Sequence, residues 1–272
     1  MQQVRDLVRD VDGHVAVYAR RLDTGESFSV GAADERFPTG SAAKFLVLLA
    51  FADRVEKGLV DPATRVTMEP TFRNRRLGSG VLRHLSDGLQ VTLQDCATLM
   101  MIVSDNVATD LLLDALGGPD AVNGVTKELA CHDVEVTSPT VWVMPPGQFG
   151  MSSPCGLADA WSLLAHDTPT SQRCRSITWR HQQREGFARL VPFSPDLPDF
   201  DLPSKLGLWS KAGSYPTVSC EAGLFETASA AWVLAVMARD LRDRGNGSAA
   251  AGPTLRAQVS KVVYDAWGAL PA

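Results

Sequence analysis

The densest run of apolar residues in the chain begins shortly after Pro38 and Gly40, two residues that break regular backbone structure. From Ser41 onward the apolar positions are so closely spaced that they predict a helix buried nearly all round. Gly58 is a natural end for this helix. Its apolar members are Phe45, Leu46, Val47, Leu48, Leu49, Phe51 and Val55.

Two further apolar helices follow one another with a polar tripeptide between them. Thr92 is a suitable N-cap, with Asp95 at the third helical position, for a helix over 93–103. Residues 104–106 interrupt the apolar pattern, and a second helix is predicted over 107–116. We expect the tripeptide to be held rigidly near a core, although Asp and Asn are also common in plain loops because their side chains mimic turns.

Strand-like alternation is found at the two ends of the chain. The predicted strands are 14–22, 27–30, 208–218, 221–226 and 231–237, and further helices are predicted over 2–11, 121–130, 157–165 and 253–267. The pattern therefore predicts an α+β fold, in which both termini build one sheet around an all-helical insert. Residues 132–156, rich in proline and glycine, predict a long irregular loop of a length that is usually functional.

The composition is that of an ordinary globular chain. Its 272 residues are 45% hydrophobic and 21% charged, with a formal net charge of −5. The net charge is negative and the sequence has no run of lysine and arginine, so it predicts no positively charged surface for nucleic acid or for a membrane. The N-terminus has no apolar core of signal-peptide length, and no stretch approaches the length of a membrane span. We therefore expect no nucleic acid and no membrane among the partners.

Cysteine and histidine spacing bears on compartment and metal binding. The five cysteines form no Cys-x-x-Cys pair, which predicts free thiols, mostly core filler, in a reducing, cytoplasmic environment. The histidines show no ligand spacing, so we expect no metal and no cofactor, and we place them at the surface or in strands. These residues are Cys96, Cys131, Cys155, Cys174 and Cys220, and His14, His84, His132, His166 and His181.

Ser41 and Lys44 stand three residues apart at the start of the buried helix, where they would be neighbours on one face. The positive end of the helix dipole and the apolar surroundings both disfavour an ammonium there, and they lower the pKa of Lys44 toward the neutral amine. A neutral amine accepts a proton from a serine hydroxyl, as in an activated nucleophile. The simpler interpretation is an N-cap serine with a lysine that reaches solvent.

Three motifs occur in a particular order along the chain. They are Ser41-Ala42-Ala43-Lys44, Ser104-Asp105-Asn106 and, on a predicted strand, Lys211-Ala212-Gly213. This set resembles the S-x-x-K, S-D-N and K-T-G motifs of serine β-lactamases and penicillin-binding proteins, and it is most similar to the class A-like branch. Lys205-Leu206-Gly207 is a competing third motif, which we set aside because Pro203 breaks its context.

The resemblance covers most of residues 13–267 and implies a β-lactamase/transpeptidase-like α+β fold. Residues 1–36 and 204–272 would form a subdomain with an antiparallel sheet and the terminal helices. Residues 37–203 would form an all-helical subdomain, with the active site in the cleft between the two.

The resemblance also implies a role for each site residue. Ser41 would attack an amide or ester carbonyl, with neutral Lys44 as general base or proton relay. Ser104 would pass a proton to the leaving group, while Lys211 would lower the pKa of Lys44 and attract an anionic substrate. Substrate contacts are implied for Asn106, Gly213, Ser214 and Tyr215. An oxyanion hole is implied for the backbone N–H groups of Ser41 and Ser214, and a structural role for Asp105. Tyr215 and Trp142 line the pocket or pack in the core.

Two departures from the family pattern bear on the reaction. Class A β-lactamases carry a glutamate in the loop after the second motif, where it activates the deacylating water, whereas residues 137–154 contain no Glu and no Asp. Asp133 and Glu135 come just before that loop, on a predicted strand. The third motif has Ala212 in place of a threonine whose hydroxyl helps hold the substrate carboxylate, which argues against a standard penicillin-like or D-Ala-D-Ala-like substrate.

An acyl-enzyme that water attacks poorly would survive to meet a better nucleophile. We therefore expect a serine-dependent acyltransferase (transacylase) that moves an acyl group from a small ester or amide to an amine, in antibiotic or other secondary-metabolite biosynthesis. The alternative is a β-lactamase-like serine hydrolase (esterase, amidase or β-lactamase) with water as the acceptor. A non-catalytic binding module is a further alternative, although such a module has no physical need for two lysines that converge on a serine. The sequence leaves the oligomeric state open.

Overall fold

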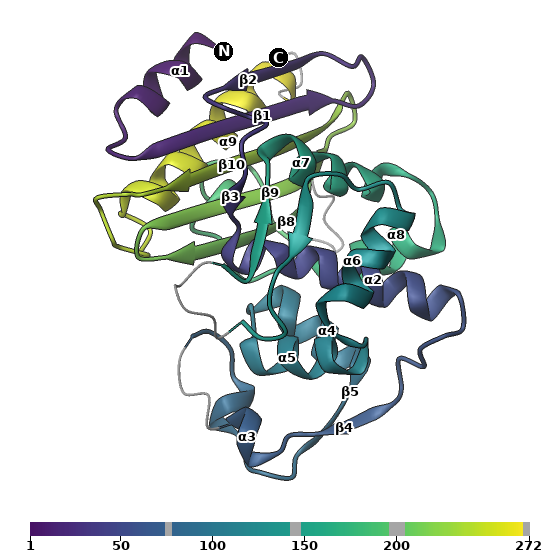
Figure 1. Ribbon diagram of the computed structural model, residues 1–272. Coiled ribbons are helices and arrows are strands. Elements are labelled where there is room, and N and C mark those ends of the chain that lie inside the picture. The colour runs from purple at the N-terminus through teal and green to yellow at the C-terminus, as the bar shows by residue number, and fades with distance from the viewer. Residues whose placement is uncertain (74–77, 142–147, 196–204, 269–272) are drawn as a thin grey trace.

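A five-stranded sheet built from both ends of the chain dominates the computed structural model, which describes residues 1–73, 78–141, 148–195 and 205–268 (Figure 1). The strand order is β2-β1-β10-β9-β8, and all neighbouring strands are antiparallel. The strands are β1 (His14–Arg21), β2 (Ser27–Val30), β8 (Gly207–Tyr215), β9 (Val218–Glu226) and β10 (Ala231–Arg239). The predicted α+β class and the sheet from both termini are confirmed.

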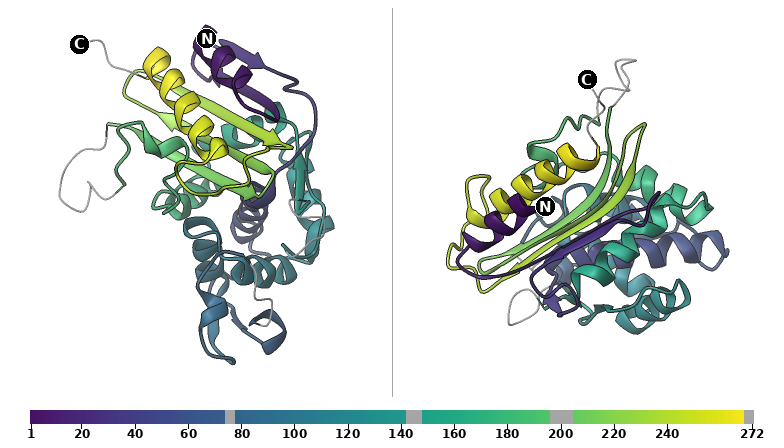
Figure 2. Two further views of the ribbon diagram at one scale, coloured as in Figure 1. Left: turned by 90° about the vertical axis from the view of Figure 1, so that its left-hand side faces the viewer. Right: turned by 90° about the horizontal axis from the view of Figure 1, so that it is seen from above.

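Helices cover both faces of this sheet (Figure 2). Helices α1 (Gln2–Arg9) and α9 (Ala251–Trp267) lie on one face, where Trp232 and Val259 belong to one apolar cluster. Helix α7 (Pro154–Ser162) packs against β1, β9 and β10 on the other face. Because β9 and β10 are covered on both sides, nearly all their residues are buried, and the sequence of β10 is apolar up to its last residue.

Helix α2 (Lys44–Glu56) is the centre of the helical part of the molecule, and its first ten residues are all buried. The helices packed around it are α4 (Leu93–Ile102), α5 (Asn106–Ala115), α6 (Gly118–Glu128) and α8 (Pro169–Thr178). The prediction that the α-helix begins at Ser41 is wrong by three residues. A 3₁₀ turn, η1 (Gly40–Ala43), comes first, as is frequent at the N-terminus of an α-helix.

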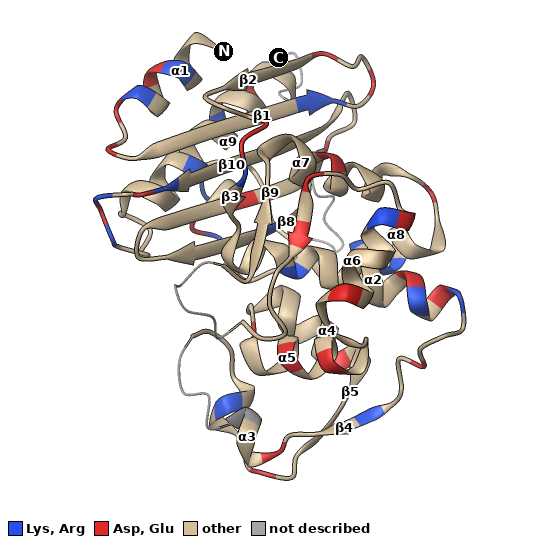
Figure 3. Ribbon diagram, viewed as in Figure 1, with Lys and Arg blue, Asp and Glu red and all other residues tan. Residues whose placement is uncertain are grey.

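Local capping signals locate α4 and α5 well. Thr92 and Asp95 form the predicted capping box, and Asp105 caps α5 by accepting the N–H of Ala108. These two helices contain acidic residues but no lysine or arginine (Figure 3). Helix α6 starts three residues before the predicted position, because Gly117 has a φ of 90° and a proline in the first turn favours the helical start.

The prediction of a uniformly irregular loop over 132–156 is wrong. Strands β6 (Val134–Val136) and β7 (Gly150–Ser152) pair within it, and β7 also pairs with β3 (Phe37–Pro38). The strand predicted around Asp133 and Glu135 is confirmed as β6, whereas β7 was missed because three residues leave no alternation for a sequence pattern to reveal. The pairing fixes one end of the long segment beside the residues that precede Ser41.

The remaining described elements are short, and they are β4 (Arg65–Thr67), β5 (Gln90–Thr92), α3 (Pro70–Arg73), η2 (Leu82–His84), η3 (Leu163–Ala165) and η4 (Phe187–Arg189). In the four described ranges, no helix combines the length and the apolar character needed to cross a membrane. The division into subdomains 1–36 with 204–272 and 37–203 remains a prediction.

Candidate active site

Ser41 lies in η1, where the chain passes from β3 into α2. The residue before it is Gly40, and a Cβ at that position would come within 3.1 Å of the Tyr215 ring. The positive φ and the close ring together require glycine here. Ser41 itself is half-buried, so its hydroxyl is placed at the edge of the packed core.

Lys44 is fully buried, and its amine points toward the second motif. Its Nζ donates to the carbonyl oxygen of Ser104 at 2.7 Å and to Oδ1 of Asn106 at 2.6 Å, and it lies 3.1 Å from Ser104 Oγ. Burial is the largest cause that lowers the pKa of Lys44 well below its usual value, and the charge of Lys211 lowers it further, against the opposing carboxylates of Asp105 and Asp110. The alternative of a lysine that reaches solvent is therefore wrong.

Ser104 stands between two lysines. Its Oγ lies 3.1 Å from the Nζ of Lys44 and 3.1 Å from the Nζ of Lys211. The residue has a φ of 56°, a conformation that is uncommon for a side chain other than glycine or asparagine. Its carbonyl accepts bonds from Lys44 and from Ser79 Oγ, which hold this strained turn in place.

Asp105 turns away from the two lysines and organises the surrounding backbone. One carboxylate oxygen accepts the N–H groups of Val81 and Leu82 at 2.6 and 2.9 Å, and the other accepts the N–H of Ala108 at 3.0 Å. The side chain is completely buried. These contacts are those of the structural residue that the sequence analysis expected.

Lys211 approaches Ser104 from β8 and is almost fully buried. Its Nζ donates to Ser104 Oγ at 3.1 Å, to Oε1 of Gln183 at 2.9 Å and to the carbonyl of Ala212 at 2.8 Å. Burial lowers the pKa of Lys211 to about 7; Glu221 acts against this shift and Arg256 adds to it. The competing Lys205 is exposed and precedes the strand.

The end of β8 lies against the nucleophile turn. A Cβ on Gly213 would be 2.1 Å from the carbonyl oxygen of Thr39 and 2.6 Å from the backbone nitrogen of Ser41, so only glycine fits. The next residues are Ser214 and Tyr215, and the Tyr215 hydroxyl donates to the carbonyl of Val141 at 3.4 Å. Trp142, the other predicted pocket residue, lies outside the described residues.

The segment after the second motif is anchored by a carboxylate of helix α5. Asp110 accepts the Thr140 hydroxyl at 2.6 Å and the N–H of Val141 at 3.0 Å, and it is buried. Glu135, by contrast, pairs with Arg36 at 2.6 Å in a half-exposed salt bridge. The carboxylate near Lys44 therefore comes from α5 and not from residues 137–154.

The sequence analysis missed two site residues, Asp110 and Gln183. Asp110 lies one helical turn beyond Asn106 on the same helix, a spacing that could have revealed it. Gln183 lies in a polar stretch without periodicity, and no sequence signal connects it to Lys211.

Predictions for the histidines and cysteines need two corrections. His181 is neither a surface nor a strand residue, since it is only 2% exposed and stacks on Phe193, and burial lowers its pKa to about 4. Cys155 is half-buried and so is not core filler, whereas the other four thiols are buried. All five cysteines are free, as predicted.

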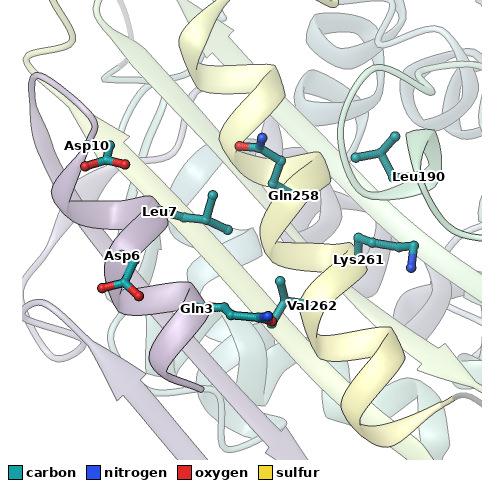
Figure 4. A pocket seen from close by; sticks show the side chains of 8 residues that line it. All are labelled: Gln3, Asp6, Leu7, Asp10, Leu190, Gln258, Lys261 and Val262. Carbon is teal, nitrogen blue, oxygen red and sulfur yellow. The ribbon is translucent and has the colours of Figure 1, made fainter.

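The described part of the chain contains no group of three or more His, Cys, Asp or Glu side chains placed to hold a metal ion. That the protein uses no cofactor remains a prediction. An open hollow between α1 and α9 is lined by Gln3, Asp6, Leu7, Asp10, Leu190, Gln258, Lys261 and Val262 (Figure 4). None of the motif residues lines it, so it is separate from the site around Ser41.

Comparisons with known proteins cover almost the whole chain. Residues 1–267 match the model of a family described as the Beta-lactamase enzyme family. The chain is 25% identical over 228 residues to β-lactamase SME-1 of Serratia marcescens, a match that spans 80% of this chain and 75% of that protein.

Solved structures lead to the same group of proteins. A mutant of PBP-A, in an acyl-enzyme complex with penicillin G, matches with a TM-score of 0.82 and 26% identity over 97% of this chain and 94% of that chain. A β-lactamase from Sphaerobacter thermophilus matches with a TM-score of 0.84 and 25% identity over 100% of this chain and 98% of that chain.

Proposed function

Because the chain belongs to the beta-lactamase enzyme family, we propose that it is a serine hydrolase that opens a small amide or ester through an acyl-enzyme on Ser41 and releases the acyl group slowly to water. The observation that carries this proposal is the convergence of the Lys44 and Lys211 amines on one hydroxyl, Ser104 Oγ. Two buried amines around one hydroxyl form a path along which a proton moves.

In the acylation step, Ser41 Oγ forms a bond to the carbonyl carbon and gives its proton to the neutral amine of Lys44. The low pKa of Lys44, caused mainly by burial, keeps this amine able to accept the proton. Ser104, in hydrogen-bond distance of that amine, gives its proton to the leaving nitrogen or oxygen as the bond to the carbonyl carbon breaks, and it takes up in return the proton that Lys44 received from Ser41. Asn106 fixes the Lys44 amine through its Oδ1 and presents its amide to the substrate.

The oxyanion of the tetrahedral intermediate would be held by the backbone N–H groups of Ser41 and Ser214. This assignment is supported by the close approach of Gly213 to the backbone nitrogen of Ser41, which brings the end of β8 beside the nucleophile. Tyr215 closes this side of the site through its contact with Val141.

Deacylation is the step that we expect to be slow. Residues 137–154 contain no acidic side chain, and Glu135 is engaged with Arg36. The two oxygens of Asp110 accept hydrogen bonds from Thr140 and Val141, so this carboxylate is engaged in holding the segment after the second motif. We therefore assign the activation of water to Lys44.

Transfer of the acyl group to an amine is the second candidate function, and the absence of an acidic residue in 137–154 favours it. The curated relatives are β-lactamases, whose name favours water as the acceptor, and neither they nor PBP-A lend support to a biosynthetic role. A non-catalytic module is set aside, because the chain is a member of a family of serine enzymes.

The test is intact-protein mass followed over time after mixing with penicillin G or a phenylacetyl thioester. We expect an adduct on Ser41 that forms faster than it is lost, and no adduct in Ser41→Ala. Ser86→Ala, which removes an exposed hydroxyl elsewhere, should behave like the unchanged protein.

Added amines separate the two candidate reactions. If simple amines discharge the adduct and appear in the acylated product, transfer is the better description; if the adduct is lost at the same rate with and without them, hydrolysis is. Absence of a Ser41 adduct from both acyl donors would refute the proposed function.

A further inference from the structure

The ammonium of Lys211 has all three of its N–H donors occupied by the protein itself. The acceptors are Ser104 Oγ at 3.1 Å, the carbonyl of Ala212 at 2.8 Å and the side-chain oxygen of Gln183 at 2.9 Å. A lysine ammonium has three donors, so none is left for a substrate. An anionic group that approaches Lys211 must displace one of these acceptors.

The three acceptors differ in how readily they can be displaced. The Ala212 carbonyl belongs to a central run of β8 backbone, paired with Glu221 on β9, and it cannot move without the strand. Ser104 Oγ also contacts Lys44, and its removal would break the proton path. Gln183 is therefore the acceptor that an incoming anion would have to replace.

Gln183 is held in position by its neighbours. The N–H of Gln182 donates to the carbonyl of Ile102 at the end of α4, at 2.8 Å. The buried ring of His181 lies 3.2 Å from the carbonyl of Gln183 and stacks on Phe193. The segment is thus tied to both α4 and an aromatic cluster, so the amide oxygen of Gln183 is pre-positioned at Lys211.

Two described neighbours of Lys211 add little to its hold on an anion. Ala212, the next residue of the strand, has no hydroxyl to donate. The guanidinium whose charge acts on Lys211 belongs to Arg256, and it is 3% exposed and paired with Glu221 at 3.3 Å. The carboxylate of Glu221 therefore offsets most of the attraction that Arg256 would exert on an anion at Lys211.

We propose that Gln183 is a specificity-determining residue: its amide oxygen occupies the place on Lys211 that a substrate carboxylate would need, so the enzyme favours acyl donors that are uncharged beside the scissile bond. This inference rests on the proposed function and specifies its substrate class. A carboxylate donor would lose one charge-assisted hydrogen bond, or would have to expel Gln183 to make it. An uncharged ester makes no charge-assisted hydrogen bond to Lys211, so the presence of Gln183 does not weaken its binding.

The test uses penicillin G and its methyl ester, which share the scissile bond and differ in the charge beside it. Equal amounts of both are mixed with the protein, and the two Ser41 adducts, which differ in mass by one methylene group, are counted in the same spectrum. Each count is corrected for the reactivity of that compound with hydroxide. We expect the ester adduct to exceed the acid adduct.

Two substitutions at position 183 should move this ratio in opposite directions. Gln183→Ala frees one N–H of Lys211 and should shift the ester-to-acid ratio toward the acid by about tenfold, the effect of one charge-assisted hydrogen bond. Gln183→Glu places a negative charge there and should shift the ratio toward the ester by a similar factor. Gln182→Ala, at the exposed neighbouring glutamine, should leave the ratio unchanged.

Each outcome supports or overturns the inference. Opposite shifts at position 183 with an unchanged ratio in Gln182→Ala support it. An unchanged ratio in both Gln183 variants, or a preference of the unchanged protein for the acid, overturns it while the proposed function stands. If neither compound forms a Ser41 adduct although the phenylacetyl thioester does, this inference is overturned and the proposed function stands; if none of the three forms an adduct, both fail.

Discussion

Removal of the Asp105 carboxylate should damage both the fold and the site. The side chain is completely buried and accepts three backbone N–H groups, those of Val81, Leu82 and Ala108. Asp105→Ala would leave these donors without their acceptor and would remove the N-cap of α5. The two active-site residues Ser104 and Asn106 flank this position directly.

The magnitude follows from the burial of each donor. Val81 is 46% exposed, so water replaces much of its bond, whereas the bonds to Leu82 and Ala108 are buried. A buried unsatisfied donor costs about 1–3 kcal/mol, and the bond to Ala108 is also the helix cap. We expect Asp105→Ala to lower the free energy of unfolding by about 4 kcal/mol, a large part of the stability of a typical domain.

The assay is guanidinium unfolding followed by circular dichroism, together with the rate of Ser41 adduct formation. Asp114→Ala is the matched control, since it removes an exposed aspartate from the same helix and should change the free energy of unfolding by less than about 0.5 kcal/mol. Acylation should fall in Asp105→Ala even where the protein remains folded, because the residue that follows the strained Ser104 loses its own hydrogen bonds to the surrounding backbone. A loss of less than about 1 kcal/mol would refute the reasoning, because two buried donors cannot lose their acceptor at so small a cost.

Three other predictions test separate parts of the structure. The pKa of Lys211 is about 7 in the folded protein and about 10.4 in the unfolded chain. Between these values the unfolded chain binds more protons, so the free energy of unfolding rises with pH. In urea titrations, this rise between pH 7 and pH 10 should be about 4 kcal/mol smaller for Lys211→Met than for the unchanged protein. Gly213→Ala would press a Cβ into the nucleophile turn and should abolish Ser41 adduct formation, whereas Gly124→Ala, in an open position of α6, should leave it unchanged. Glu221→Gln would leave Arg256 buried without its counter-charge and should lower the free energy of unfolding by about 3–5 kcal/mol, and a change below about 1 kcal/mol would contradict the buried ion pair.

Much of the fold was readable from local patterns. The strands of the main sheet, the buried run of α2 and the capping box at Thr92 each leave a periodic or positional signal within a few residues. The three motifs were also visible, because each is a set of residues close together in sequence. Paired strands of two or three residues, such as β3 with β7, were missed because alternation needs more length to appear.

The sequence by itself determined the three motifs that we expect to carry the chemistry, whereas tertiary structure decided what surrounds them. Lys44 and Ser104 are 60 residues apart in the sequence. Lys211 is 107 residues from Ser104 and 28 residues from Gln183, and it contacts both. Such contacts depend on how whole helices and strands pack. The sequence around a polar residue in a stretch without periodicity does not indicate which distant residue it will contact. For that reason the motifs predicted a site of Ser41 and two lysines, and only the packed chain brought Gln183 and Asp110 to that site.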